Sequence, residues 1–540
     1  MTEDHASGLT TNSRQRIHLI TERAILCSLT LYALFAPHSI ALTQGAYLLG
    51  MAAWCVQIIA ARRYKHPRTP VDVALLGFFA CCVISSFLSY YPLISIKGLR
   101  SPAFFLAFYF VAYKVKNLKF AYTLALVLVG SCLVNVAYSA GQLAIGRGLQ
   151  IDSIKPESQF AKQGLQVGDV ILEADGKKLK TIEDLSNAIN AQRGRVKITF
   201  QRSEMLSYAI LSRRKLINSA GFGGELFGIT TSPGRSFRVS GFYSHYETYA
   251  EVLQLIGSLA IGLLIALPNK RSGTAIFLGV SILLIAAALI MTSTRAAMAG
   301  LATAAAIMAI ISFRRRVVVF AMLAILLLSP VALYVLQKSR GISMIDLKEG
   351  STAYRLEVWK EAFGLIVTHP LTGIGKGSEG MLKEELGLFG NGRLPQSHFH
   401  STPIQIAVWW GLPALAFYFA LMTILARESW KLSRFLRAEG QEKLWGLALG
   451  GIGVIVSFNV SSIVHFNFGD GEVVMTLWLV TGLVFAVRRI ALAPRDASRP
   501  ENTPAPPAAE GSRKSLHPTP AAAAESNARA ATARPDSQPR

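Results

Sequence analysis

Residues 274–316 read TAIFLGVSILLIAAALIMTSTRAAMAGLATAAAIMAIISFRRR, and this stretch decides the class of fold. Two apolar runs, 274–292 and 296–313, flank a short polar step that contains Arg295, and three arginines close the stretch. One helix of about 20 apolar residues is long enough to cross the hydrocarbon core of a bilayer. The stretch therefore predicts two membrane-spanning helices joined by a turn.

The same apolar pattern recurs along most of the 540 residues, of which 51% are hydrophobic and only 16% are charged. Soluble domains carry roughly 25% charged residues, so an ordinary soluble enzyme and a disordered chain are both excluded. We expect a polytopic α-helical membrane protein with about twelve transmembrane helices. They lie near residues 24–42, 44–60, 71–90, 99–113, 119–145, 247–267, 274–292, 296–313, 317–336, 403–426, 444–464 and 472–487.

Basic residues predict how these helices are oriented. The chain has 55 Lys and Arg against 32 Asp and Glu, a net charge of +23. Most of the basic residues lie in short loops, and about 22 of them fall on one side when the N-terminus is placed in the cytoplasm. Both termini are then cytoplasmic, and the two long hydrophilic segments, 146–246 and 337–402, are external. A nucleic-acid partner is excluded, because no basic stretch is interleaved with aromatic residues.

The cysteines and the chain ends define the remaining organisation. All five cysteines lie in apolar segments, which excludes a disulfide framework and a thiolate metal site. No cleavable signal precedes the first apolar run, so we expect the first helix to be a retained anchor. We divide the chain into N-terminal helices (1–145), an external domain (146–218), a second membrane region (219–490) with the external loop 337–402, and a disordered cytoplasmic tail (491–540).

The external segment 146–218 has the pattern of a small α+β domain. An apolar run at Val170–Leu172 leads to an Asp175-Gly176 turn, and Thr181 with Asp184 forms a capping box ahead of a helix. The sequence IDSIKPESQFAKQGLQVGDVILEADGKKLKTIEDLSNAINAQRGRVKITFQR, residues 151–202, resembles a bacterial PDZ domain. That resemblance implies binding of a peptide carboxyl end, which we place at Gly148, Leu149, Gln150 and Ile151. A purely structural spacer is the alternative.

Four external stretches hold polar residues at the membrane boundary: SFRVSGFYSHYETYAEVL, MTSTRAAMAG, STAYRLEVWKEAFGLIVTHPLTGIGKG and SHFHSTPIQIAVWWGLPAL. Ionisable residues at such positions are costly and therefore point to function. Arg295 and Arg355 each offer a fork of donors suited to a phosphate. The alternative for Arg295 is a membrane anchor, and the alternative for Arg355 is a solvated charge. His400 is suited to accept a proton from a hydroxyl, with structural hydrogen bonding as its alternative. His-x-His spacing does not make a metal site, and no metal or cofactor is expected.

In this order the four stretches resemble the O-antigen ligase and polymerase superfamily, which includes bacterial protein O-oligosaccharyltransferases. The matching residues are Ser293–Arg295, Arg355–Trp359, Pro370–Gly375 and His398–Gln405, with Ser401 where the family usually has Asn. The resemblance implies a multi-pass enzyme of the bacterial inner membrane with a periplasmic active face. Its donor would be a glycan on undecaprenyl pyrophosphate.

The resemblance also implies roles for individual residues. Arg295 and Arg355 would stabilise the leaving pyrophosphate, and His400 would be the base that acts on the acceptor hydroxyl. Arg238, His245 and His398 are expected to contact the donor or the acceptor. The acceptor stays open between lipid A core, a growing glycan chain and a protein side chain.

Two other classes of function remain. One is a non-enzymatic membrane sensor or scaffold whose PDZ-like domain binds envelope peptides. The other is a transporter, which the scarcity of charged residues at mid-bilayer disfavours.

Overall fold

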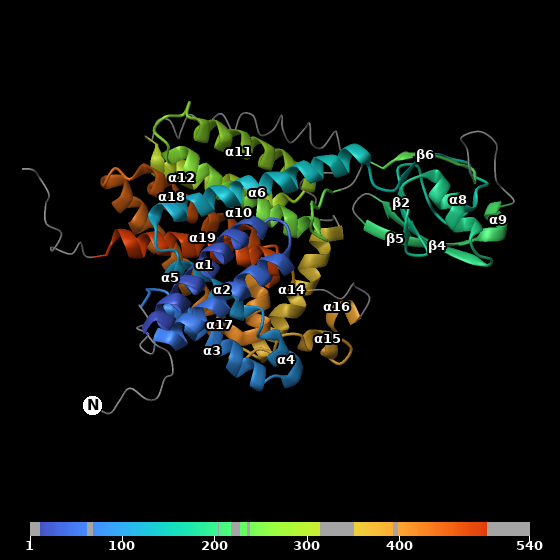
Figure 1. The fold of residues 1–540 in the computed structure, drawn as a ribbon. Coiled ribbons are helices and arrows are strands. Elements are labelled where there is room, and N and C mark those ends of the chain that lie inside the picture. The colour runs from blue at the N-terminus through green and yellow to red at the C-terminus, as the bar shows by residue number, and fades with distance from the viewer. Residues whose placement is uncertain are drawn as a thin grey trace, which may run out of the picture. The chain divides into compact units, whose positions relative to one another are not determined.

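A computed structural model describes residues 11–61, 68–202, 205–217, 227–234, 238–313, 350–391 and 398–493. Most of them are helical, and the small sheet lies between residues 149 and 233 (Figure 1). The expected helix at 317–336 and nearly all of the expected tail fall outside the described residues.

Ten of the helices described in these ranges are long and apolar enough to cross a membrane, which confirms the polytopic α-helical class. The helices are α1 (Thr11–Phe35), α2 (Ile40–Ala61), α3 (Asp72–Phe87), α4 (Pro92–Gly98), η1 (Pro102–Phe105), α5 (Leu106–Lys114), α6 (Leu118–Ile145), α10 (Tyr246–Ala266), α11 (Gly273–Thr292), α12 (Arg295–Ser312), α14 (Gly350–Thr368), α15 (Ser378–Leu382), α16 (Leu388–Asn391), α17 (Thr402–Ala438), α18 (Glu442–Ser462), η2 (Asn467–Gly469) and α19 (Gly471–Ala491). The span expected at 99–113 is instead a broken segment made of α4, η1 and α5.

Helices α10, α18 and α19 form the centre of the membrane region (Figure 1). Their apolar windows are about four-fifths buried, 83%, 78% and 83% respectively, whereas those of α1 and α2 are 33% buried. Small residues let α10 and α18 approach closely: a Cβ added at Gly262 would lie 2.3 Å from the backbone nitrogen of Gly450. Small residues at helix contacts are the usual means of close packing in membranes. Helices α10 and α18 are therefore in direct backbone contact.

Helix α17 is kinked where the loop 370–375 pairs with it. Gly411 has φ 81° and ψ 173°, which are not helical values. Ile374 N donates to Val408 O (2.9 Å) and Gly375 N donates to Trp409 O (2.9 Å). The glycine-rich loop thus uses these two amides to satisfy carbonyls that the kink leaves open.

The PDZ-like domain contains an antiparallel sheet of order β5-β4-β2-β1-β6, with β3 paired to β2. Its strands are β1 (Leu149–Ile154), β2 (Val170–Ala174), β3 (Lys177–Lys178), β4 (Arg195–Arg202), β5 (Met205–Ser212) and β6 (Ile229–Pro233), and its helices are α7 (Gln159–Lys162), α8 (Ile182–Asn190) and α9 (Arg213–Ile217). The capping box at Thr181 and Asp184 is present at the start of α8. The core of this domain includes Phe160, Leu185 and Phe227.

Strand β6 changes two sequence-based expectations. It pairs antiparallel with β1 along Leu149–Ile154, so residues beyond 218 belong to this sheet and we place the end of the domain after Gly234. Leu149 and Gln150 also pair with β2 on their other side. Because a strand can add only to a free edge, the peptide site expected at Gly148–Ile151 does not fit this topology.

Candidate functional site

Arg295 is placed by a tight turn between α11 and α12. Ser293 has φ 59°, a left-handed conformation that reverses the chain so that α12 begins at Arg295. Val239 N bonds to Met291 O (3.4 Å), which ties the segment before α10 to this turn. The first turn of α12 carries no acidic residue. A half-buried guanidinium at the positive end of a helix dipole is suited to an anion.

The segment His398–His400 is held rigidly between α14 and α17. Phe399 N donates to Gln405 Oε1 (2.8 Å), and Phe399 O accepts from Trp359 Nε1 (2.8 Å). His400 N donates to His398 Nδ1 (3.1 Å), and the two rings lie 4.2 Å apart. Since His398 Nδ1 accepts a hydrogen bond, neutral His398 carries its proton on Nε2.

His400 has two unusual features. Its φ is +49°, a left-handed conformation that costs a non-glycine residue about 1–3 kcal/mol. Its buried Nδ1 has no hydrogen-bond partner among the described residues. Burial, with smaller effects of His398 and Arg355, lowers the pKa of His400 to about 3. Burial likewise lowers the pKa of His398 to about 4. Both imidazoles are therefore neutral at physiological pH.

Arg355 lies on α14 beside this histidine pair. The ring of its neighbour Tyr354 meets the His400 ring edge-on, with centroids 5.5 Å apart. The guanidinium acts on the pKa of both His398 and His400, which places its charge within electrostatic range of each. The structure thus brings Arg355 close to His398 and His400. Arg355 and His400 are 45 residues apart in the sequence.

Arg238 and His245 approach the cluster from the start of α10. The Arg238 guanidinium lies over the Tyr246 ring (4.5 Å to its centroid), and the His245 ring stacks on the same residue at 4.5 Å. His245 caps α10 by accepting from Glu247 N (3.3 Å). Its side chain is 54% exposed, so it lies at the solvent-facing rim.

Three ionisable residues that the sequence analysis did not single out complete the cluster. His465 Nδ1 lies 2.8 Å from Glu251 Oε1, and its Nε2 lies 3.8 Å from Glu247 Oε1. Burial by itself would lower the pKa of His465, but the hydrogen bond and charge of Glu251 outweigh it and raise that pKa above its usual value. His465 is therefore more basic than His398 and His400.

Helix α17 is anchored to His465 by its first residue. Thr402 N and Oγ1 both donate to His465 O (3.0 and 3.2 Å), and Thr402 Oγ1 also contacts Asn467 Oδ1 (2.8 Å). Pro403 stands in the first turn of α17, where a proline costs no helical hydrogen bond. The position of His400 is thus coupled to the loop between α18 and α19. In the sequence, the one signal that could have pointed to His465 is that it is an ionisable residue at a membrane boundary.

Comparison with protein families agrees with this geometry. Residues 256–419 match the family model described as O-antigen ligase, and residues 150–202 match the PDZ domain model. The chain therefore combines a membrane region similar to O-antigen ligases with a domain similar to PDZ domains. A search of curated proteins finds no match.

The matched O-antigen ligase region contains Arg295, Arg355, His398 and His400, while Arg238, His245 and His465 lie outside it. This match, in a polytopic membrane chain, supports a membrane-embedded glycosyl-transferring enzyme. The charges that act most strongly on His398 and His400 include Arg355 but not Arg295. In the part of the chain that the structure describes, no group of three or more His, Cys, Asp or Glu side chains is arranged to hold a metal ion.

Proposed function

We propose that the chain transfers a glycan from undecaprenyl pyrophosphate to an acceptor hydroxyl at the periplasmic face of a bacterial inner membrane. The observation that carries the proposal is the convergence of Arg355 with the neutral His400 in a half-buried cluster at one end of the central helices. One group binds an anion and the other accepts a proton. A glycosyl transfer from a diphosphate donor needs both.

His400 is the base in this proposal. The acceptor oxygen attacks the anomeric carbon while the bond from that carbon to the pyrophosphate oxygen breaks. The electron pair leaves with the pyrophosphate, and the acceptor proton passes to His400. Attack from the side opposite the leaving group inverts the anomeric carbon.

The low pKa of His400 is a property of the cluster before the donor arrives. Burial, His398 and the positive charge of Arg355 hold it down, and a bound pyrophosphate would place negative charge beside Arg355. An opposite charge within about 4–6 Å favours the protonated imidazole. Donor binding therefore raises the basicity of His400 at the moment when a base is required.

Arg355 and Arg295 stabilise the leaving group. Negative charge grows on the pyrophosphate during the reaction, and preorganised cations in a poorly hydrated site stabilise it strongly. Arg295 adds the positive end of α12 to its own charge. Arg238, His245 and His398 line the same region, and we assign them to binding of donor or acceptor.

Transfer assays on membranes that contain the full-length chain test this assignment. Single substitutions of Arg295 or His400 by Ala are expected to reduce transfer by about 10²-fold or more at equal expression, and Arg355→Ala by about 10-fold or more. Lys360→Ala is the matched control, because Lys360 is an exposed cation on α14. Full activity in all three site variants would remove the assignment.

The acceptor remains one of three classes: lipid A core, a growing glycan or a protein. Deletion of the gene, followed by mass spectrometry of lipopolysaccharide, exopolysaccharide and periplasmic proteins, identifies the product that loses its glycan. The PDZ-like domain favours a protein as substrate or recruited partner.

Peptide capture by this domain would use the outer edge of β6. Gly234 N donates to Gly148 O (3.0 Å), so by antiparallel alternation the N–H of Thr231 points away from β1. Thr231→Pro removes that donor without breaking the pairing with β1. We expect it to abolish binding of a C-terminal peptide library by the full-length chain and to leave thermal unfolding unchanged.

A non-enzymatic sensor or scaffold is the second function that the PDZ-like domain supports. Under that alternative, the Thr231→Pro variant would lose the function of the unmodified chain in cells, while the Arg355→Ala variant would retain it.

A further inference from the structure

The far end of α17 extends beyond the membrane core. The helix has 37 residues, about 55 Å at 1.5 Å per residue, whereas the hydrocarbon core is about 30 Å thick. Its N-terminal end adjoins His400, so the residues from Arg427 onward lie at the opposite boundary of the bilayer. The charge pattern of the loops predicts that this boundary is cytoplasmic.

Two adjoining hollows lie there between α12, α17 and α18. One has a volume of about 390 Å³ and is bordered by Arg434 and Arg437. The other has a volume of about 500 Å³ and is bordered by Ile307, Ile310 and Ile452. Ile311 and Trp430 line both, so the two form one groove with a basic and an apolar end. Volumes of about 300–1,000 Å³ are typical of small-ligand sites.

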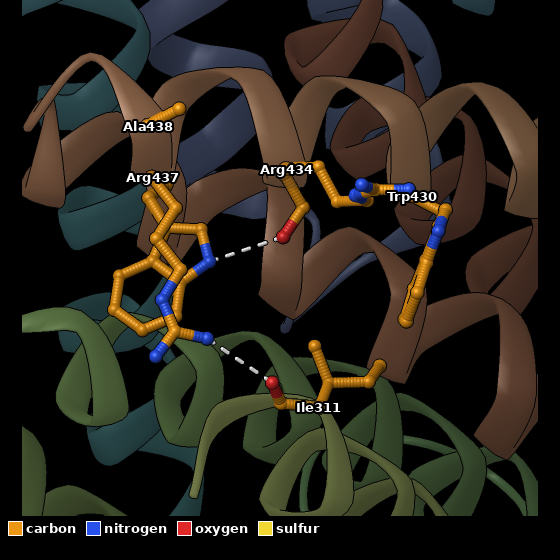
Figure 2. Close-up of a pocket in the computed structure, with 7 residues that line it drawn as sticks. Ile311, Trp430, Arg434, Arg437 and Ala438 are labelled. Carbon is orange, nitrogen blue, oxygen red and sulfur yellow. Dashed lines mark hydrogen bonds between the residues drawn. The ribbon is translucent and has the colours of Figure 1, made fainter. Parts of the chain in front are cut away.

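The basic end is built on one face of α17. Figure 2 shows Trp430, Arg434 and Arg437 on this helix beside Ile311 of α12. Arg437 is already engaged: it donates to Ile311 O (3.1 Å) and Ser312 O (3.2 Å), and it lies over the Trp445 ring (4.8 Å). It closes the last turn of α12 and forms a wall of the groove.

Two other cations of this face are not neutralised. Arg427 and Arg434 are exposed and have no ion-pair partner in the part of the chain that the structure describes. Glu428, which lies between them in sequence, is already paired with Lys431 (2.8 Å) and Arg488 (2.9 Å). The groove therefore combines two arginines that form no ion pair with a described residue, an apolar channel and a tryptophan that is 41% exposed.

We propose that this groove binds one anionic glycerophospholipid of the cytoplasmic leaflet. Its headgroup phosphate lies between Arg427 and Arg434, and one acyl chain lies along Ile307, Ile310 and Ile452. Basic pockets between helices on the cytoplasmic side suit anionic headgroups, and tryptophan favours the same depth in the bilayer. A soluble anion would leave the apolar end unfilled, and a zwitterionic lipid would gain less from the two arginines. The site is separate from the proposed glycan transfer.

Native mass spectrometry of the full-length chain in detergent, titrated with phosphatidylglycerol or phosphatidylcholine, tests the proposal. We expect one saturable phosphatidylglycerol, bound at least tenfold more tightly than phosphatidylcholine. The double variant Arg427→Ala/Arg434→Ala should weaken this binding by about 30-fold. Ala426→Trp, which fills the apolar end without changing charge, should also weaken it. Arg271→Ala, an exposed cation on the same predicted side, should leave it unchanged.

Three results would overturn the proposal. They are equal binding of the two lipids, unchanged binding in both groove variants, and saturable binding of polyprenyl phosphate without binding of phosphatidylglycerol. A photo-crosslinking amino acid at position 430 gives a second, independent measurement. Crosslinks to added phosphatidylglycerol support the site, whereas crosslinks to residues 314–349 would show that the chain itself covers the groove.

Discussion

The Arg355→Ala substitution has two opposite effects on the proposed reaction. The guanidinium lowers the pKa of His400, after burial and His398, so its removal makes the base stronger. It also removes a cation that would stabilise the leaving pyrophosphate. The two effects have opposite signs, and their sizes decide the outcome.

Loss of the cation that stabilises the leaving pyrophosphate is the larger of the two effects. Even a full pKa unit at His400 strengthens the base by less than about tenfold in rate, because proton transfer is incomplete in the transition state. Removal of one preorganised donor to a developing anion costs about 10²–10³ in kcat. We therefore expect a net fall of about 10–100-fold or more. Arg355→Lys should fall less, since it keeps the charge but loses the forked geometry.

The assay is single-turnover glycan transfer by purified full-length chain in lipid nanodiscs, with donor in excess and pH varied. Lys360→Ala, on the same helix, is expected to match the unmodified chain. An Arg355→Ala variant that is correctly folded and retains its full rate would refute the role of Arg355 and the convergence that carries the proposed function.

Three further predictions concern pH and stability. Burial keeps His400 neutral down to about pH 3, so kcat/KM of the free enzyme should show no acidic limb between about pH 7 and 5; a limb near pH 6.5 would contradict this burial. His465→Gln breaks a buried pair with Glu251 and should cost about 3–5 kcal/mol of stability, measured by thermal unfolding and restored in part by adding Glu251→Gln. The folded-state pKa of His465 is raised, so its contribution to the free energy of unfolding is present below about pH 6.5 and is lost as pH rises through the raised pKa. The His465→Gln variant should not show this loss of stability. Gly411→Ala should prevent folding, since the new Cβ would lie 2.2 Å from Leu371 O. Gly364→Ala, where the new Cβ would have open space around it, should leave stability unchanged or raise it by about 0.5–1 kcal/mol. Equal yields of the two folded variants would contradict the kink geometry.

In the proposed function, the pairing of a membrane region similar to O-antigen ligases with a PDZ-like domain would link two kinds of recognition in one chain. The membrane cluster suits a lipid-borne diphosphate, and the edge strand β6 suits an extended peptide. Pro233 lacks an N–H and so limits how far a peptide strand extends along β6. Recruitment of a protein would then depend on the first residues of that strand.

Local patterns in the sequence were enough to determine the membrane class, most of the spans, the capped helix of the external domain and the motifs that hold Arg295, Arg355 and His400. Apolar runs, caps and short motifs depend on neighbouring residues, and neighbouring residues are what a sequence displays. The span expected at 99–113 has only a short apolar run, from Pro102 to Tyr113, and the structure divides this segment into α4, η1 and α5.

Only the tertiary structure decided which distant residues meet. Strand β6 joins β1 across 80 residues, and that pairing removes the edge on which the expected peptide site depended. His465 reaches Glu251 across 214 residues and supports α17 through Thr402. Such pairs form because buried charges and open backbone groups need partners wherever the fold supplies them, and no local periodicity records that need.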